Sequence, residues 1–212
     1  MKVNNPKYVT YYIDENFEFI LTQIHNCYRK MLVKYDFIEN NENKIKNRLY
    51  RDFLNNQSII DELKLNGYRF KTETGFVDEN YNEVGYSDIE IIDLIGSLKN
   101  IESFYIIECK RIDGLNSHYQ SSLNNKYIND GINRFIEEKY PTNNKVNGML
   151  GFVVKEIDIK ENSTYFTDLN SYKFIDDFEF SYKSNHITKS NKKITLYHLM
   201  LDYSSKINPT SN

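Results

Sequence analysis

The spacing of apolar side chains in the first third of the chain predicts helices. Between residues 15 and 34, apolar residues recur at every third or fourth position, which is the period of one helix face. The same period predicts a second helix from Asn41 to Leu54. A third, short helix is expected from Ile59 to Leu65. It should end at Asn66-Gly67, because both residue types readily take the left-handed conformation found at helix ends.

The pattern then changes to that of strands. Residues from Tyr68 to Phe76 alternate between apolar and polar, which predicts a strand with one buried face. The segments Ser87–Ile95 and Phe104–Arg111 are rich in β-branched and aromatic residues. Gly96-Ser97 and a short polar stretch separate them. These two segments are therefore expected to form an antiparallel pair inside a sheet.

The second half of the chain alternates between the two patterns. Helical spacing returns from His118 to Tyr140 and should stop at Pro141, because proline cannot continue a helix. Gly148–Ile157 and Ile194–Tyr203 are apolar enough to predict two further strands, while residues 158–193 fit neither period. Helices followed by strands, a helix and more strands are typical of a layered α/β domain with a mixed sheet.

Length and composition favour one folded domain. The chain has 212 residues, of which 40% are hydrophobic and 15% aromatic, and only eight are glycine and three proline. These values exclude collagen-like and Pro/Gly-rich disordered classes. We expect a single domain over residues 1–203, with a flexible tail from Ser204 to Asn212.

The sequence also indicates the cellular compartment in which the protein works. Cys27 and Cys109 are too few for a disulfide scaffold, and no CxxC or HExxH motif predicts a zinc site. The longest apolar run, Val146 to Val154, is far shorter than the roughly 18 residues that span a bilayer. The N-terminus lacks the apolar core of a signal peptide. We therefore expect a soluble, cytoplasmic protein without a membrane partner.

Charge is sorted along the chain although the formal net charge is only −3. The segments from Arg29 to Arg51 and from Lys183 to Lys193 are basic. The segment from Glu73 to Asp93, which lies between them, holds acids and neither lysine nor arginine. Basic margins around an acidic centre suit a metal-dependent enzyme that acts on a polyanion. The candidate DNA-binding residues in the first basic segment are Lys44, Lys46, Arg48 and Arg51. Ordinary solvation of these side chains is the alternative interpretation.

Most familiar catalytic motifs are absent. The sequence contains no phosphate-binding loop, no dinucleotide fingerprint and no nucleophile elbow. His198 and Asp202 can share one strand face, but we interpret them as an ordinary, partly buried polar pair.

One combination of carboxylates and lysine is more selective. Residues i and i+2 of a strand point to the same side, so Glu108 and Lys110 project together while Cys109 points toward a core. Asp88 lies near the start of the partner strand. Carboxylate oxygens at such a place suit Mg²⁺, which prefers hard oxygen ligands and phosphate partners. The lysine can hold an attacking water or help to deprotonate it.

At these residues the chain resembles the PD-(D/E)xK nuclease superfamily, which has the restriction-endonuclease-like fold. The resemblance rests on YSDIEI (Tyr86 to Ile91) and YIIECKR (Tyr105 to Arg111), and it covers roughly residues 42–154. The chain departs from the motif at one position, where Ser87 stands in place of the proline. The resemblance implies an α/β fold with a restriction-endonuclease-like core, in which helices flank a mixed β-sheet.

The resemblance also implies roles for individual residues. Asp88 and Glu108 would bind the catalytic Mg²⁺, for which Mn²⁺ can substitute. The main-chain carbonyl of Cys109 would be an additional metal ligand. Lys110 would orient the attacking water, and the products would carry a 5′-phosphate and a 3′-hydroxyl.

Two helices could add further residues to the site. Glu42 falls on the apolar stripe of the second predicted helix. Many members of the superfamily carry a glutamate near the metals, on a helix before the sheet. The alternative is that Glu42 only stabilises the first turn of its helix. In the helix after the ExK strand, Gln120 is the candidate catalytic residue. Arg134 is an alternative that could bind a phosphate.

The sequence therefore predicts a Mg²⁺-dependent DNA endonuclease, with bacterial restriction or anti-phage defence as the expected context. DNA repair or junction resolution uses the same site and remains an alternative. Two further alternatives are a non-cleaving protein of the same fold and a structural ion-pair network formed by Asp88, Glu108 and Lys110. A partner protein of a defence system, a homodimer, and RNA as the substrate also stay open.

Overall fold

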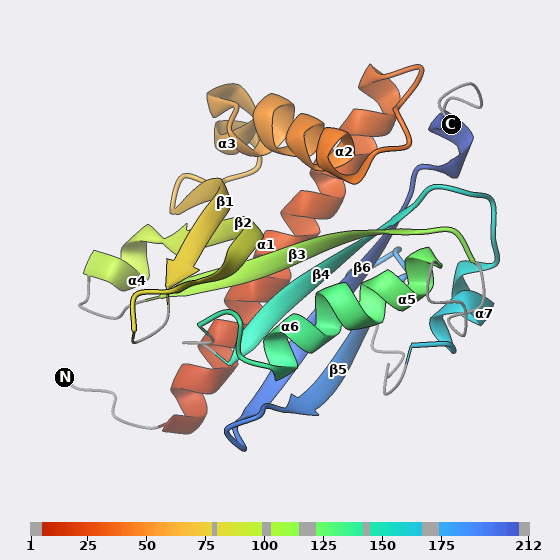
Figure 1. Ribbon diagram of the computed structural model, residues 1–212. Coiled ribbons are helices and arrows are strands. Elements are labelled where there is room, and N and C mark those ends of the chain that lie inside the picture. Colours follow the sequence, from red (N-terminus) through yellow and green to blue (C-terminus); the bar gives the residue numbers. More distant parts are fainter. Residues whose placement is uncertain are drawn as a thin grey trace.

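The computed structural model describes residues 6–77, 80–98, 103–114, 122–141, 145–166 and 174–207. Its centre is a six-stranded mixed sheet with the order β1-β2-β3-β4-β6-β5. The strands are β1 (Tyr68–Val77), β2 (Glu83–Asp93), β3 (Phe104–Ile112), β4 (Val146–Val153), β5 (Ser181–Ile187) and β6 (Lys193–Asp202). The expected α/β class with helices around a mixed sheet is confirmed (Figure 1).

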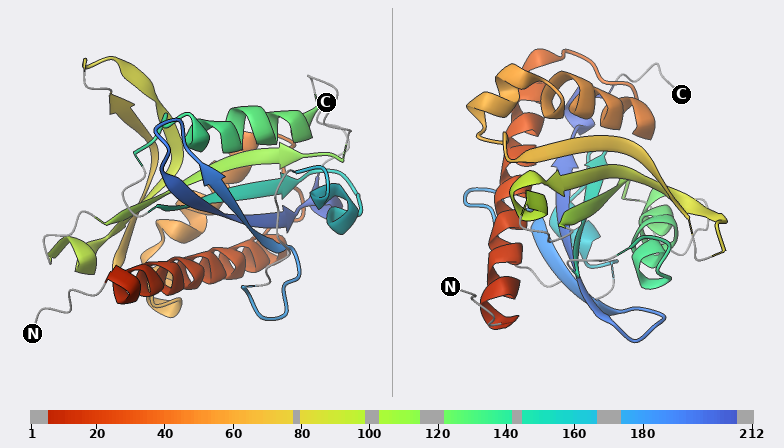
Figure 2. Two further views of the ribbon diagram at one scale, coloured as in Figure 1. Left: turned by 90° about the horizontal axis from the view of Figure 1, so that it is seen from below. Right: turned by 90° about the vertical axis from the view of Figure 1, so that its left-hand side faces the viewer.

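Helices occupy both faces of this sheet. They are α1 (Pro6–Lys34), α2 (Glu42–Leu49), the π-helix η1 (Tyr50–Leu54), α3 (Gln57–Glu62), α4 (Leu94–Leu98), α5 (Leu123–Tyr127), the π-helix η2 (Ile128–Ile132), α6 (Asn133–Ile136), α7 (Ile159–Ser163) and the 3₁₀ turn η3 (Ser204–Lys206). Figure 2 shows the sheet lying between α1 on one side and the α5–α6 segment on the other. No helix in the described ranges is long and apolar enough to cross a membrane.

The sheet combines antiparallel and parallel pairing. β1, β2 and β3 form an antiparallel meander, and β5 pairs antiparallel with β6. β4 lies parallel to both β3 and β6. The connection from β3 to β4 crosses one face of the sheet through α5, η2 and α6, as a parallel pair requires.

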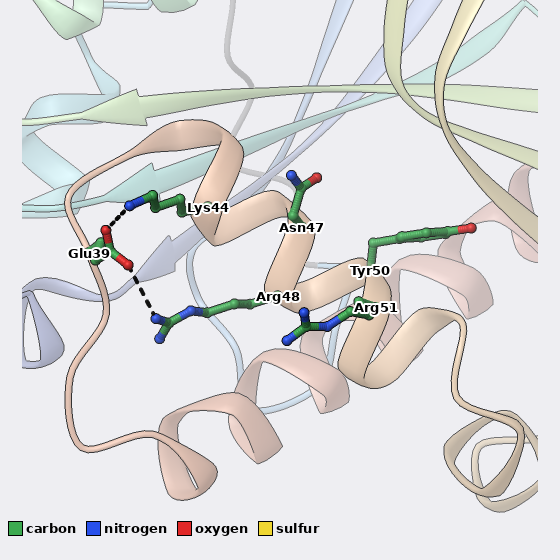
Figure 3. Close-up of a pocket in the computed structure, with 6 residues that line it drawn as sticks. All are labelled: Glu39, Lys44, Asn47, Arg48, Tyr50 and Arg51. Atoms are coloured by element: carbon green, nitrogen blue, oxygen red, sulfur yellow. Dashed lines mark hydrogen bonds and ion pairs between the residues drawn. The ribbon is translucent and has the colours of Figure 1, made fainter.

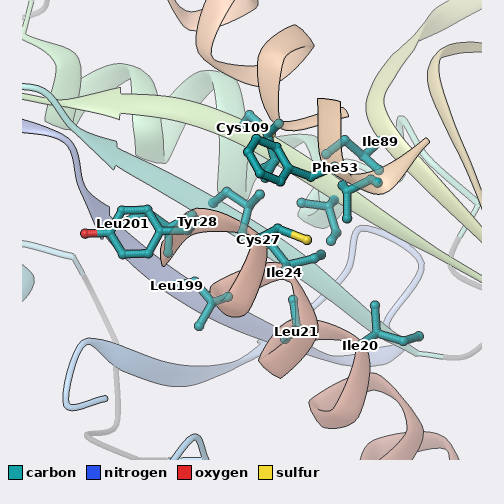
Figure 4. Close-up of a cluster of buried hydrophobic side chains, with 14 of the residues drawn as sticks. Ile20, Leu21, Ile24, Cys27, Tyr28, Phe53, Ile89, Cys109, Leu199 and Leu201 are labelled. Atoms are coloured by element: carbon teal, nitrogen blue, oxygen red, sulfur yellow. The ribbon is translucent and has the colours of Figure 1, made fainter. Parts of the chain in front are cut away.

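Two hydrophobic clusters bury the two faces of the sheet. The first joins α1, through residues such as Phe17 and Ile24, to Ile107 and Cys109 of β3 (Figure 4). The second joins the α5–α6 segment to the opposite face, where Ile106 lies. Because side chains alternate along a strand, Glu108 and Lys110 interrupt the second face with charge, as the sequence predicts.

Most predicted elements are present, and their ends differ for identifiable reasons. The strand expected to reach Ile95 ends at Asp93, because the Asp93 carboxylate accepts hydrogen bonds from the backbone of Ile95 and Gly96 and starts α4. The strand expected to reach Ile157 ends at Val153. The undecided segment 158–193 contains α7 and β5.

The expected tail does not begin at Ser204. Residues 204–206 form the turn η3, and the backbone N–H of Ile38 donates to the Lys206 carbonyl at 2.7 Å. Ile207 forms a parallel bridge with Ile38. Ile207 packs against the first core cluster, and this apolar contact accounts for the regular structure of residues 204–207.

The helix predicted from His118 to Tyr140 is described from residue 122 and is interrupted by η2. Gly131 lies in η2, where an added Cβ would come within 2.5 Å of the Met149 side chain and 3.5 Å of Lys110. The missing side chain therefore allows this helix to pack closely on β3 and β4, as expected.

Candidate functional site

The site forms where β2 and β3 separate. Pairing between these strands ends at Ile89 and Ile107, so the next β3 residues need other partners for their backbone N–H groups. A carboxylate oxygen of Asp88 accepts from the N–H of Cys109 at 2.8 Å. A carboxylate oxygen of Glu42 accepts from the N–H of Arg111 at 3.0 Å. Two acids thus replace strand carbonyls at this open edge.

The start of α2 places Glu42 beside β3. Asn41 caps the helix by accepting from the N–H of Lys44, so Glu42 is its first residue. The Arg111 guanidinium donates to Asn40, both to its backbone carbonyl at 2.9 Å and to its side chain at 2.8 Å. These bonds hold the N-terminal end of α2 against β3. Glu42 therefore lies in the first turn of its helix and also in the site.

Four oxygens surround the Lys110 ammonium. Its Nζ lies 2.7 Å from Glu108 Oε1 and 2.9 Å from the Cys109 carbonyl oxygen. Glu42 Oε1 is 3.3 Å away and Asp88 Oδ2 is 3.8 Å away. Burial lowers the pKa of Lys110, but the charges of Glu108, Glu42 and Asp88 outweigh it and raise this pKa above its ordinary value. Lys110 is therefore charged at neutral pH.

Glu108 is the most buried acid of the site, with 1% of its side chain exposed. Its Oε1 also accepts from Arg134 at 3.2 Å, and its Oε2 accepts from the Tyr140 hydroxyl at 2.7 Å. Burial and the neighbouring Asp88 raise the pKa of Glu108. Burial and the charge of Glu108 raise the pKa of Tyr140 as well, so Tyr140 remains a hydrogen-bond donor. Tyr140 was not predicted from the sequence.

The expectation that Lys46 lies on an exposed, DNA-contacting surface is wrong. Its side chain is only 2% exposed, and its Nζ lies 2.9 Å from Asp88 Oδ1 and 3.4 Å from Glu73 Oε1. Asp88 and Glu73 therefore accept from Lys46, which does not lie on the surface that was expected to contact DNA. Lys46 follows Glu42 by four positions, and this spacing puts both residues on one helix face. That spacing was the signal available in the sequence.

The other three basic residues of this segment line the outside of the helix. Lys44 and Arg51 are exposed, and Arg48 is partly exposed. Together with neighbouring side chains they border a groove of about 450 Å³ (Figure 3), lined by Glu39, Lys44, Asn47, Arg48, Tyr50 and Arg51.

These outer cations have local acidic partners. Lys44 and Arg48 both pair with Glu39. Arg51 donates to Asp52 at 2.9 Å. Arg48 also lies over the Tyr35 ring, with its guanidinium carbon 4.8 Å from the ring centre. The positive charge of this face is therefore partly neutralised within the chain.

The structure brings Glu42, Asp88, Glu108, the Cys109 carbonyl and Lys110 together, and it adds Arg134 through Glu108. Gln120 lies outside the described residues. The three carboxylates of Glu42, Asp88 and Glu108 lie among three cations, which are Lys46, Lys110 and Arg134, and Glu73 adds a fourth carboxylate beside Lys46. In the described part of the chain, no group of three acidic, histidine or cysteine side chains is arranged to hold a metal ion.

A second buried polar network lies elsewhere, on β5, β6 and α5. The two ring nitrogens of His198 bond the Tyr127 hydroxyl at 2.8 Å and the Ser184 hydroxyl at 2.7 Å. The Asp202 carboxylate accepts instead from the N–H of Ser204. Burial and the nearby His186 lower the pKa of His198 to about 3, so His198 is neutral. The expected pairing of His198 with Asp202 is therefore wrong.

No protein-family model matches this chain, and searches of curated proteins and of solved structures find no significant match. The functional argument therefore rests on the site itself.

Proposed function

We propose that this protein is a Mg²⁺-dependent nuclease that hydrolyses phosphodiester bonds in DNA. The observation that carries the proposal is the convergence of four oxygens, from Glu42, Asp88, Glu108 and the Cys109 carbonyl, around one ammonium group. Carboxylate and carbonyl oxygens are the ligands that Mg²⁺ and Mn²⁺ accept. A buried site that already stabilises the Lys110 ammonium is also suited to a metal cation.

The residues divide into ligands and water-handling groups. Glu42, Asp88, Glu108 and the Cys109 carbonyl would hold the Mg²⁺ ion, for which the Lys110 ammonium would have to leave the centre of these oxygens. A bound Mg²⁺ would neutralise negative charge that develops on the phosphate oxygens. Lys110 then orients the attacking water. The water oxygen forms the new bond to phosphorus as the bond to O3′ breaks. The water gives up a proton to solvent and O3′ takes one up, so the products carry a 5′-phosphate and a 3′-hydroxyl.

Further side chains complete the proposed roles. Arg134 is partly exposed and touches Glu108, so it can bind a phosphate group of the substrate at the rim of the site. Tyr140 holds the second oxygen of Glu108 and thereby fixes the orientation of this ligand. The proposed contacts to the DNA backbone are Lys44 and Arg48 on the outside of α2 and Arg51 of η1.

The fold supports the same proposal. A helix precedes three antiparallel strands, and a crossover through helices leads to a fourth strand parallel to the third. This arrangement resembles the core of restriction-endonuclease-like nucleases, and we propose that finer class for the domain. A role in anti-phage defence is the context we expect. Because a repair enzyme would cut branched DNA and a ribonuclease would cut RNA, the cleavage assay includes both substrates.

The test is cleavage of linear, branched and RNA substrates with Mg²⁺ or Mn²⁺, and with a chelator as the negative control. Asp88→Asn keeps an acceptor for the Cys109 N–H but removes a charge, and it should lower cleavage on the order of 10³-fold. Glu90→Gln is the matched control. Glu90 is a buried acid two residues along the same strand face, and it bonds Thr74 at 2.8 Å outside the site.

One observation favours a second candidate, a structural ion-pair network without catalysis. The three site carboxylates lie among three cations, and each already accepts hydrogen bonds. Under this alternative, Mg²⁺ and Mn²⁺ leave the Tm unchanged and no substrate is cut. Under the nuclease proposal the Tm rises with metal concentration, because a ligand that binds only the folded state stabilises it.

A further inference from the structure

Two ammonium groups share Asp88. The Lys110 ammonium lies on the side of Asp88 Oδ2, among the four oxygens proposed to hold Mg²⁺. The Lys46 ammonium lies 2.9 Å from Asp88 Oδ1 and 3.4 Å from Glu73 Oε1. A carboxylate with one cation on each oxygen is the arrangement that bridges two metal ions in two-metal sites. Here both places hold a lysine ammonium, and only that of Lys110 lies among the oxygens proposed to hold Mg²⁺.

Glu73 is held in this arrangement by an unusual backbone. It is a non-glycine residue in the middle of β1, yet its φ is 55°, a left-handed value that is rare within a strand. Its neighbours Thr72 and Thr74 keep regular pairing with Ile89 and Ser87 of β2. The departure is therefore confined to the residue whose carboxylate reaches Lys46.

Lys46 is a fixed part of the site. It lies in α2, directly after the buried Ile45. Its side chain is only 2% exposed, whereas that of its partner Glu73 is 62% exposed. Ile45 and Leu49 anchor the same helix face in the core. The ammonium therefore approaches Asp88 from the protein side, where it is kept from solvent.

We propose that Lys46 takes the place of a second divalent ion, so that this site holds a single metal. The inference rests on the proposed function and specifies how it works. Lys46 supplies the positive charge next to Asp88 Oδ1 that a second metal would otherwise provide. It is a residue that determines the number of metals bound, and it orients Asp88 toward the remaining metal position.

The experiment counts Mn²⁺ ions bound to the full chain by calorimetry and by electron paramagnetic resonance. The wild-type protein should bind one Mn²⁺. Lys46→Met keeps the length of the side chain and removes its charge, so this variant should bind a second Mn²⁺ between Asp88 and Glu73, and the two ions should show magnetic coupling. Lys46→Arg is the matched control and should still bind one.

A double variant locates the second ion. Lys46→Met combined with Glu73→Gln removes a ligand of the new position and should return the number of bound ions to one. Adding Mn²⁺ should also raise the Tm of Lys46→Met more than that of the wild type, because the ion replaces the missing buried charge.

The outcomes separate the two proposals. Two Mn²⁺ ions on the wild-type chain, or a single ion on folded Lys46→Met, would overturn the role of Lys46 and leave the nuclease proposal standing. No Mn²⁺ on the wild-type chain would overturn the nuclease proposal itself. If Lys46→Met does not fold without metal, the count on the wild-type chain still decides, and a count of one together with metal-induced refolding of the variant supports the inference.

Discussion

Two buried polar networks in the described part of the chain differ in kind. The network around Lys110 is charged and joins α2, β1, β2, β3 and the α5–α6 segment. The network around His198 is neutral and joins α5 to β5 and β6. A neutral network stabilises a fold by satisfying buried groups. A charged one holds ions at a higher desolvation cost, and its presence calls for a functional explanation.

The two networks also differ in whether a metal ion can take the place of one of their groups. In the His198 network, the hydroxyl groups of Tyr127 and Ser184 bond the two nitrogens of one imidazole, and Ser184 also bonds His186. In the charged network, the Lys110 ammonium is held mainly by charge, and a divalent ion can compete for the same oxygens. Variants of each network should therefore affect different measurements.

The largest effect is expected from Lys110→Met. Without the ammonium, Glu42, Asp88 and Glu108 repel one another, and the free energy of unfolding should fall by about 3–5 kcal/mol without metal. Mn²⁺ should bind more tightly than to the wild type, because no side chain competes, and it should restore the Tm. Turnover should fall by about 10²–10⁴-fold because the water-orienting group is missing. Metal binding weaker than in the wild type, measured by calorimetry, would contradict this role.

His198→Leu should have the opposite profile. The Tyr127 hydroxyl is left without its partner in the core, which should cost about 1–3 kcal/mol of stability at pH 7, measured by urea unfolding. Cleavage should stay within the error of the wild type. A large decrease in cleavage by a folded variant would show that the two networks are not separate.

The same variant tests the pH dependence. The pKa of His198 is lowered to about 3 in the folded protein, by burial and by His186, so below pH 6.5 the unfolded chain takes up a proton that the folded protein refuses. Wild-type stability should therefore fall by about 1.4 kcal/mol per pH unit from pH 6.5 toward 4 through this residue. His198→Leu should lack that contribution, and its deficit should narrow on acidification.

A smaller effect is expected from Tyr140→Phe. The ring stays in the core, but Glu108 no longer receives the hydrogen bond that orients its Oε2. Metal affinity or turnover should fall by about 10–100-fold, the range seen when such supporting bonds are removed. Tyr28→Phe is a suitable control, because Tyr28 is also buried and donates to a backbone carbonyl far from the site. Equal decreases in both variants would show only a general packing effect.

The smallest effect is expected from Arg51→Glu on the exposed side of η1. DNA binding should weaken about equally for all sequences. The log–log slope of affinity against salt concentration should become shallower by about 0.9 for each phosphate that the variant no longer neutralises. Lys160→Glu, an exposed change in α7 outside both basic segments, serves as the control. An unchanged slope in Arg51→Glu would show that this side chain does not touch the DNA backbone.

The sequence by itself determined most of the helices and strands, and it identified the strand that carries Glu108 and Lys110. Helix and strand periods depend on neighbours a few positions apart, so α2, β2 and β3 were predicted close to their observed ranges, and so was the shared side of Glu108 and Lys110. The π-helical break in the α5–α6 segment and the elements of residues 158–193 were not predicted. Their local sequence fits more than one period, and packing on the sheet selects the conformation.

Only the tertiary structure decided how the site is assembled. The contacts that define it join residues far apart in sequence: Lys46 to Asp88 across 42 positions, Tyr140 to Glu108 across 32, and Glu42 to the Arg111 backbone across 69. Local spacing carries no information about which distant group satisfies an open N–H or a buried charge. Lys46 shows the consequence, since its sequence neighbours suggested a solvent-exposed DNA contact. The separation of β2 from β3 and the packing of α2 against it turned this lysine into a buried partner of Asp88, because a charge on the inner face of a helix must be neutralised where it lies.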